Sequence, residues 1–490
     1  MKEIKTMGEL EASGYRPRSI QQEMRENLLS CWENGEAVFE GIHGYEHSVI
    51  PELERAILSG HHINLLGLRG QAKTRLARLM TTLLDEYTPV LLDSELNEDP
   101  MAPISRQARE RIEELGPSTP VGWMHRSERF MEKLATPDVS VADLIGDVDP
   151  LKAANLGLSY ADERSIHFGM VPRAHRCIFV INELPDLQPR IQVALFNILE
   201  EGDIQIRGFK LRLPLDLQFV FTANPEDYTN RGSIVTPLKD RIGSQILTHY
   251  PDNLETAMQI TAQEARLTDF QKEAIHLPEW ARELVEQIVF QARESEYIDA
   301  KSGVSARMSV TALENLMSTA ERRARKNSEA TTTVRLMDFM GVVPSITGKV
   351  ELVYEGEQQG SMAVAERLIG EAVKAMHPRY FPPLDKLKAS DEASPYQGLL
   401  NWFGEGKTLE LEYDMDDSKY AAALESCAPA LRFVQGQKLE RSDELFVLEM
   451  ILWALSEHAK LNRDKLVTGL TFNDLFNSYF QGLSDEETTA

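Results

Sequence analysis

Residues 67–74 combine glycine, lysine and threonine at a spacing suited to binding phosphate. They read Gly-Leu-Arg-Gly-Gln-Ala-Lys-Thr and follow the short apolar run 63–66. Glycines let the backbone approach an anion closely, and successive N–H groups before a helix form a phosphate nest. The spacing is close to GxxxxGK[ST], in which Lys73 would reach the β- and γ-phosphates and Thr74 would bind Mg²⁺.

One position of this loop departs from the pattern, because Ala72 stands where a glycine is usual. A methyl group is tolerable there if the residue keeps helical φ and ψ angles. Arg69 could contact phosphate or remain a solvated arginine. The residues predicted to bind the nucleotide are Gly67, Arg69, Gly70, Gln71, Ala72, Lys73, Thr74 and Arg75.

A second segment ends an apolar run with two polar residues. Residues 177–181 read Cys-Ile-Phe-Val-Ile and are followed by Asn182 and Glu183. In P-loop ATPases a carboxylate at the first position holds Mg²⁺, and Glu183 fits a general base that polarises water. Asn182 is neutral, so it can hold a metal-bound water but adds no charge. We therefore predict a metal site at Thr74 and Asn182, and the missing charge leaves open whether Asn182 lowers Mg²⁺ affinity and hydrolysis.

Two further residues follow in order. Asn224 ends the apolar run 217–222, and Arg241 comes 17 residues later in Thr-Pro-Leu-Lys-Asp-Arg. A surface salt bridge is the ordinary role of any single arginine. The order and spacing of the four segments argue for a shared site instead.

Strand and helix patterns alternate along the first half of the chain, which indicates an α/β core with a parallel sheet. Residues 93–140 are polar and irregular and are interpreted as an insertion, with a helix at 105–115. From residue 251 the pattern is almost entirely helical. The predicted domains are an N-terminal helical segment 1–35, an α/β nucleotide-binding core 36–250, a helical lid 251–345 and a mainly helical C-terminal domain 346–490. Buried strands are expected at 63–66, 88–92, 177–181 and 217–222, and helices at 74–84, 188–200, 254–265, 279–294 and 309–325.

Composition narrows the classes of function. The chain has 490 residues and a formal net charge of −25, which makes non-specific nucleic-acid binding unattractive. The start is charged and no apolar run is long enough to span a bilayer, so a cytoplasmic protein without membrane contact is expected. Three isolated cysteines predict neither disulfides nor a zinc site. His61-His62 is interpreted as a surface pair, and Asp414–Asp417 as a solvated helix start.

The ordered motifs resemble those of AAA+ ATPases of the magnesium-chelatase I-subunit and MoxR group. Residues 135–149 are similar to the chelatase segment that ends in a GTID-like turn, and residues 169–176 to the run that precedes Walker B. Leu199–Gly202 with the predicted hairpin 203–213 resembles the pre-sensor-1 insertion, and His249-Tyr250-Pro251 the end of the core. The likeness covers about residues 36–340. The sequence departs from the family pattern at Ala72, at Asn182 and across 182–186.

The resemblance implies an α/β P-loop core with a helical lid, which hydrolyses ATP between subunits of a ring, commonly a hexamer. Asn224 would orient the attacking water, Arg241 would enter the neighbour's site, and Arg307 would touch the γ-phosphate from a lid helix. An arginine supplied in trans can contribute about 10³–10⁵ in rate. A protein with a von Willebrand A domain is the implied partner.

Three alternatives to a remodelling motor remain open. Asn182 favours a nucleotide-dependent scaffold with little turnover. The resemblance also allows the ATPase subunit of a metal chelatase, although the altered 182–186 pattern disfavours it. A sigma-54-type activator is least favoured, because neither a GAFTGA-like loop nor a helix-turn-helix is evident.

Overall fold

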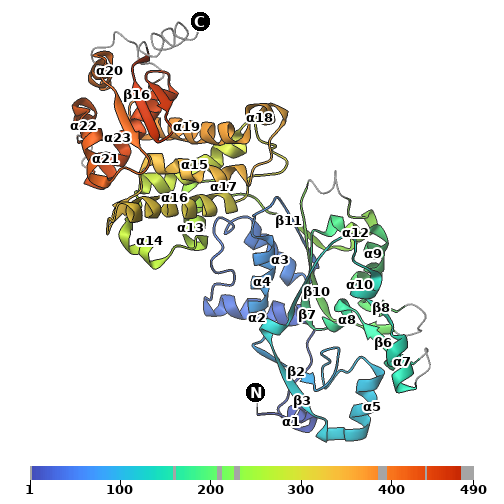
Figure 1. Ribbon diagram of the computed structural model, residues 1–490. Helices are drawn as coiled ribbons and strands as arrows, with labels where there is room; N and C mark the ends of the chain where they lie inside the picture. The colour runs from blue at the N-terminus through green and yellow to red at the C-terminus, as the bar shows by residue number, and fades with distance from the viewer. Residues whose placement is uncertain are drawn as a thin grey trace. The chain divides into compact units, whose positions relative to one another are not determined.

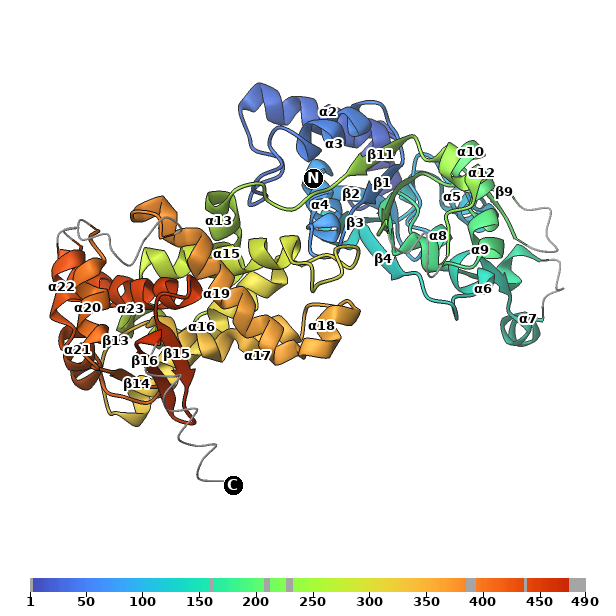
Figure 2. The same cartoon turned by 90° about the horizontal axis from the view of Figure 1, so that it is seen from above.

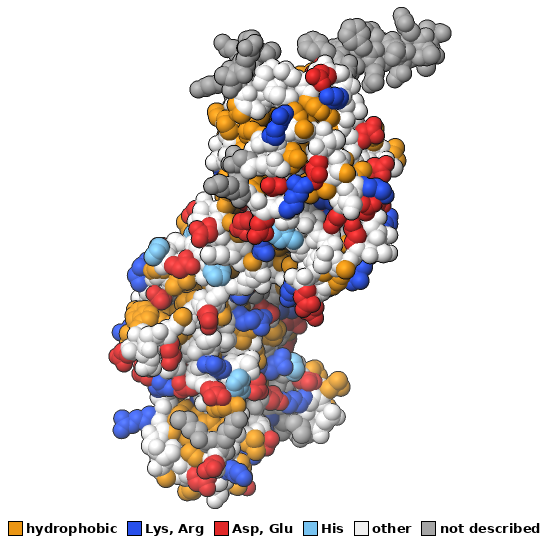
Figure 3. All heavy atoms as spheres, turned by 90° about the vertical axis from the view of Figure 1, so that its left-hand side faces the viewer, with side chains coloured by type: hydrophobic (Ala, Val, Ile, Leu, Met, Phe, Trp, Pro, Cys, Tyr) orange, Lys and Arg blue, Asp and Glu red, His pale blue; other side chains and the backbone are white. Residues whose placement is uncertain are grey.

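The computed structural model describes residues 3–157, 162–206, 212–225, 232–384, 394–435 and 439–475. The chain forms two compact units, Met1–Tyr250 and Pro251–Ala490 (Figure 1). Within the described ranges, no helix is both long enough and apolar enough to cross a membrane. Acidic and basic side chains are interspersed on the face drawn in Figure 3.

A five-stranded sheet forms the centre of the first unit. Its order is β11-β1-β10-β7-β4, and every neighbouring pair is parallel. All carboxyl ends therefore meet at one edge. The strands are β1 (Ile63–Leu66), β4 (Phe130–Leu134), β7 (Cys177–Asn182), β10 (Leu217–Ala223) and β11 (Ser244–Leu247).

Helices cover both faces of this sheet (Figure 1). Along β7, Cys177, Phe179 and Ile181 pack into one hydrophobic cluster, and Ile178 and Val180 into another. This alternation explains the continuous apolar run, because a strand covered on both faces needs apolar residues at every position. One face packs on α2 (Ile20–Asn34), α3 (Val49–Leu58) and α4 (Lys73–Leu79), and the other on α8 (Met170–Arg173), α9 (Pro189–Ala194), α10 (Phe196–Glu201) and α12 (Thr236–Arg241).

The interpretation of residues 93–140 as an insertion is wrong in part. Residues 130–134 form β4, which pairs with β7 at the edge of the central sheet. Because an edge strand is half exposed, this segment contains Glu132 and Lys133 and lacks a continuous apolar signal. The strand expected at 88–92 is present as β2 (Tyr87–Leu91), but it pairs with β3 (Val121–His125) in a separate two-stranded sheet.

Smaller elements decorate the sheet. The expected helix at 105–115 is α5 (Arg106–Leu115), whereas the one expected at 188–200 breaks between α9 and α10. Strands β5 (Gly146–Val148) and β6 (Ile166–Phe168) form one antiparallel pair, and β8 (Asp203–Gln205) and β9 (Arg212–Pro214) form the predicted hairpin. Its tip, 207–211, lies outside the described residues.

The second unit is mainly helical around one hydrophobic cluster. Ile346 of α17 (Val343–Thr347), at the predicted boundary between residues 345 and 346, is buried in this cluster. A three-stranded antiparallel sheet, β14-β16-β15, completes the unit (Figure 2). Its principal elements are α13 (Leu254–Glu264), α15 (Glu279–Glu294), α16 (Arg307–Lys326), α19 (Ser361–Tyr380), α23 (Arg441–Glu457), β14 (Leu409–Glu412), β15 (Asn462–Lys465) and β16 (Gly469–Asn473).

The three aspartates Asp414, Asp416 and Asp417 pair with basic side chains, so their interpretation as a solvated helix start is incomplete. Asp417 accepts hydrogen bonds from Arg323 at 3.0 Å and from Arg335 at 2.6 Å. Both arginine side chains are almost fully buried. Asp414 pairs with Arg322 and Lys326. A buried arginine needs such partners because an unpaired charge in the interior is costly.

Candidate functional site

The loop 67–72 connects β1 to α4 at the carboxyl edge of the central sheet. The N–H of Gly67 donates to the carbonyl of Ala223 at 3.1 Å, which continues the pairing of β1 with β10. A Cβ at position 67 would collide with the side chains of Thr248 and Gln71. Gly70 has a φ of 75°, a left-handed conformation that favours glycine. The loop therefore needs both glycines.

Ala72 does not have the helical backbone under which a methyl group would be tolerable at this position. Its φ and ψ are 55° and 16°, which places an alanine in the left-handed region immediately before α4. The left-handed conformation costs a residue with a Cβ roughly 1–2 kcal/mol. Glycine would avoid this cost, so the departure from the loop pattern is strained in this structure.

Lys73 opens α4 and turns back over the loop. Its side chain is buried, and its ammonium group donates to the carbonyls of Gly67 and Leu68. It also donates to the Asn224 side-chain oxygen at 3.2 Å. A positive charge is thus held against the loop, next to the end of β10.

Asn224 connects this lysine to the predicted base. Its Nδ2 donates to Oε2 of Glu183 at 3.3 Å, while its Oδ1 accepts from Lys73. Glu183 follows β7 with φ and ψ of 55° and 51°. Non-glycine residues in this region are strained and cluster at functional sites. Lys73, Asn224 and Glu183, predicted from separate segments, are therefore brought together at one edge of the sheet.

Thr74 and Asn182, the predicted metal ligands, are also neighbours. The Thr74 hydroxyl donates to Oδ1 of Asn182 at 3.4 Å. Both offer neutral oxygens, which suit Mg²⁺ when substrate phosphates and water complete an octahedron. In the part of the chain that the structure describes, no cluster of three or more His, Cys, Asp or Glu side chains could hold a metal alone.

Thr222 supports both residues that follow β7, and the sequence interpretation missed it. Its hydroxyl donates to Oδ1 of Asn182 at 3.2 Å and accepts from the N–H of Glu183 at 3.1 Å. The available signal was a hydroxyl within the otherwise apolar stretch Phe219–Phe221 and Ala223. Thr222 orients Asn182 and Glu183 from the neighbouring strand.

Arg241 lies away from this site within its own chain. It lines a cavity of about 320 Å³ with His61, His62 and Leu217, which lie at the amino ends of β1 and β10. Its guanidinium pairs with Glu200, with the Nε–Oε2 distance at 2.8 Å. Arg241 therefore cannot be counted among the residues around Lys73 in one subunit.

His62 is only partly a surface residue, in contrast to the expectation for the histidine pair. Its Nδ1 accepts the N–H of Phe219 at 3.2 Å, and its ring packs edge-on against the Phe219 ring. Burial lowers the pKa of His62 to about 4, which keeps the ring neutral at neutral pH. His61 is exposed.

Three other predicted residues have defined places but untested roles. Arg307 is exposed at the first position of α16, in the second unit. Arg75 lies in the first turn of α4. The carbonyl of Arg69 accepts from the Tyr250 hydroxyl at 2.9 Å. Their contacts with nucleotide stay predictions.

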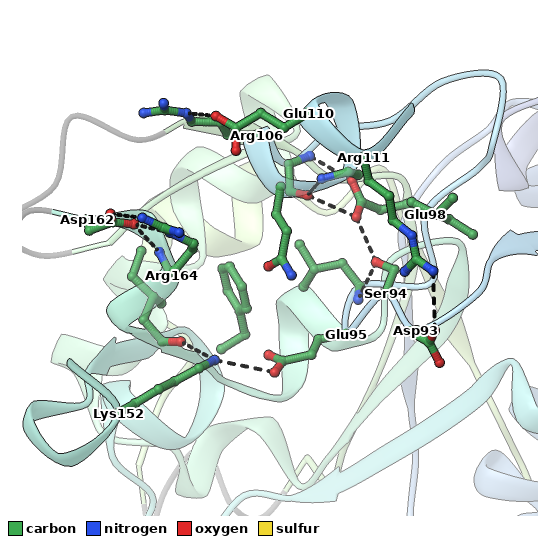
Figure 4. Close-up of a pocket in the computed structure, with 17 residues that line it drawn as sticks. Asp93, Ser94, Glu95, Glu98, Arg106, Glu110, Arg111, Lys152, Asp162 and Arg164 are labelled. Carbon is green, nitrogen blue, oxygen red and sulfur yellow. Dashed lines mark hydrogen bonds and ion pairs between the residues drawn. The ribbon is translucent and has the colours of Figure 1, made fainter. Parts of the chain in front are cut away.

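A second cavity, of about 160 Å³, shares no lining residue with the phosphate-binding loop (Figure 4). Four ion pairs surround it, and each joins two residues of its own lining. They are Arg106–Glu110, Arg111–Asp93, Lys152–Glu95 and Arg164–Asp162. The buried carboxylate of Glu98 accepts hydrogen bonds from Ser94, Ile104 and Ser105. The charged side chains named here, which line the second cavity, therefore already form ion pairs or hydrogen bonds within the protein.

Comparison with known proteins finds solved structures of low similarity to this chain, and no family model matches the sequence. A proposed ATPase from Cytophaga hutchinsonii shares 18% identity over 74% of this chain and 97% of its own, with a TM-score of 0.31. A complex of the magnesium chelatase subunits BchI and BchD shares 18% over 66% and 98%, with a TM-score of 0.36. NtrX from Brucella abortus shares 15% over 70% and 66%, with a TM-score of 0.37.

The chelatase complex belongs to the group that the sequence motifs resemble. All three TM-scores lie below 0.5. The function is therefore inferred from the strand order, the loop and the contacts of Lys73. The α/β P-loop core with a parallel sheet, flanking helices and a mainly helical region after it is confirmed.

Proposed function

We propose that the protein hydrolyses ATP as an AAA+ ATPase. One observation carries the proposal: Lys73, Asn224 and Glu183 form a hydrogen-bonded chain at the carboxyl edge of the sheet, beside Thr74 and Asn182. Ligands of open parallel sheets bind at this edge. The set contains a phosphate-binding cation, a carboxylate and two oxygen donors for a metal, which are the groups that phosphoryl transfer requires.

Each residue has a distinct role in this proposal. Lys73 leaves the loop carbonyls to pair with the β- and γ-phosphates, and Thr74 and Asn182 hold Mg²⁺, which neutralises phosphate charge. Glu183 accepts the proton of the attacking water as the γ-phosphate leaves ADP. Asn224 keeps the Glu183 carboxylate oriented through its Nδ2 and links it to the Lys73 ammonium through its Oδ1.

We further propose that identical subunits assemble into a ring. By analogy with the family, the ring has six subunits. Arg241 would reach the nucleotide of the adjacent subunit, because within its own chain it lines a cavity with residues at the amino ends of β1 and β10. Arg307 would contact the γ-phosphate from the second unit. The ring would remodel or activate a protein partner that carries a von Willebrand A domain.

A low-turnover scaffold is the second candidate, and two observations favour it. Asn182 brings no charge to the metal, and Ala72 strains the phosphate loop. Such a protein would bind ATP tightly enough to assemble but would hydrolyse it slowly. ATP binding without measurable turnover, alone and in the assembled state, would distinguish it from the motor.

ATP binding by titration calorimetry tests the common basis of both candidates. We expect Lys73→Met to weaken binding by about 10- to 150-fold, because a hydrogen bond to a charged group contributes about 1.5–3 kcal/mol. Lys152→Met is the matched control, since Lys152 lies at the second cavity and contacts Glu95. Equal affinity in the parent and Lys73→Met would contradict the site.

A further inference from the structure

The last residues of the first unit are hydrogen-bonded directly to the phosphate-binding loop. The Thr248 hydroxyl donates to the side-chain oxygen of Gln71 at 2.7 Å. Two residues later, the Tyr250 hydroxyl donates to the carbonyl of Arg69 at 2.9 Å. Both contacts reach the middle of the loop from the segment that follows β11. The second unit begins with the next residue, Pro251.

Tyr45 ties the same two segments together from a third element. Its ring is buried and its hydroxyl lies 3.0 Å from the Gln71 carbonyl and 2.8 Å from the His249 carbonyl. Since a hydroxyl has one proton, that proton is shared between the two carbonyls. The Tyr45 ring also packs edge-on against the His249 ring, with centroids 5.0 Å apart. The loop and the terminal segment are thus held by a common buried group.

Packing around Gly67 makes this connection stiff. The Thr248–Gln71 pair occupies the space in which a Cβ at position 67 would lie. The N–H of Thr248 also donates to the carbonyl of Leu66, the last residue of β1, at 2.9 Å. Close-packed groups shift together. A change in the backbone of the loop must therefore either move residues 248–250 or break these hydrogen bonds.

We propose that Thr248, Tyr250 and Tyr45 form a strap that transmits nucleotide binding at the loop to the connection between the two units. The inference rests on the proposed function, because it takes ATP as the ligand that reshapes the loop. The strap consists of positioning residues that act through the backbone carbonyls of Arg69 and Gln71 and the side-chain oxygen of Gln71. Coupling between two sites requires a physical link with a state that each site can bias, and the strap supplies this link.

The test removes single hydroxyl groups and follows the start of the second unit. Hydrogen exchange of amides 251–258 is measured in the full chain with and without Mg-ATP, and ATP affinity is measured in parallel. Tyr250→Phe and Thr248→Val each delete one strap hydrogen bond, and Thr248→Ser restores the hydroxyl. Tyr354→Phe is the control, because Tyr354 is 68% exposed on α18 (Tyr354–Gln359).

In the parent, in Thr248→Ser and in Tyr354→Phe, ATP should change the hydrogen exchange of amides 251–258. In Tyr250→Phe and Thr248→Val the change should fall about fivefold, the factor that one neutral hydrogen bond contributes, while ATP affinity stays within about threefold. An undiminished change in variants that bind ATP would overturn the strap alone. A fall matched by an equal loss of affinity would also overturn it, because the hydroxyl would then act on binding only. Failure of the parent to bind ATP would overturn the proposed function as well.

Discussion

Replacing Ala72 with glycine should stabilise the loop that precedes α4. At φ 55° and ψ 16°, alanine pays roughly 1–2 kcal/mol for its left-handed backbone. Glycine removes this strain but gives back about 0.5–1 kcal/mol through the greater freedom of the unfolded chain. We therefore expect Ala72→Gly to raise the free energy of unfolding of the first unit by about 0.5–1 kcal/mol.

Native-state hydrogen exchange of the α4 amides measures this effect, because the amide of Leu76 donates to the Ala72 carbonyl at 2.9 Å. Ala77→Gly is the matched control. Ala77 is fully buried within α4, so the same substitution there should destabilise the helix by at least about 1 kcal/mol. A gain of stability in Ala72→Gly together with a loss in Ala77→Gly would support the left-handed backbone of Ala72. A loss of stability in Ala72→Gly would refute the left-handed assignment and return this residue to a helical backbone.

Three further predictions concern charge. Asn182→Asp should lower the Mg²⁺ concentration for half-maximal ATP binding by at least about fivefold, because a charge near 4 Å contributes about 1 kcal/mol even in water; an unchanged requirement would remove Asn182 from the metal site. Mixing Arg241→Ala with Lys73→Met, each inactive alone, should restore hydrolysis if Arg241 acts on the neighbour's nucleotide; a silent mixture would contradict that role. Burial raises the pKa of Glu449 from 4.5 to about 7. The folded state then binds the proton more tightly than the unfolded chain, so stability should fall as pH rises from 4.5 to 7, by about 1.4 kcal/mol per pKa unit. Glu449→Gln should flatten this fall in urea titrations, and an unaltered slope would exclude Glu449 as its source.

The central strands and their site residues were predictable because their patterns are local. Residues 177–181 are apolar at every position, as a strand covered on both faces must be, and Asn182 and Glu183 mark where it ends. The loop at 67–74 is recognisable from the spacing of its glycines, lysine and threonine along the sequence. Parallel pairing then brings Glu183 and Asn224 to the edge where Lys73 lies.

Other features depend on contacts that no local pattern records. Residues 130–134 form an edge strand with charged side chains, so their pattern resembles that of a loop. Ala72 adopts its left-handed backbone because the loop must close between β1 and α4, and propensity alone favours the opposite. Thr222 is one hydroxyl in an apolar strand, and Tyr45 lies more than 20 residues before the loop that it holds. Their roles follow only from three-dimensional proximity.

Steady-state ATP hydrolysis by the parent protein and by Glu183→Gln, with ATP binding measured on the same samples, tests the central claim most directly. Glutamine keeps the shape of the side chain and its contact with Asn224 but cannot accept the proton of water. A parent that hydrolyses ATP and a variant that binds ATP with similar affinity but has lost at least about 100-fold of the turnover would agree with Glu183 as the base. Equal turnover in the two proteins, or a parent that does not bind ATP, would contradict the assignment of this edge of the sheet as an ATPase site.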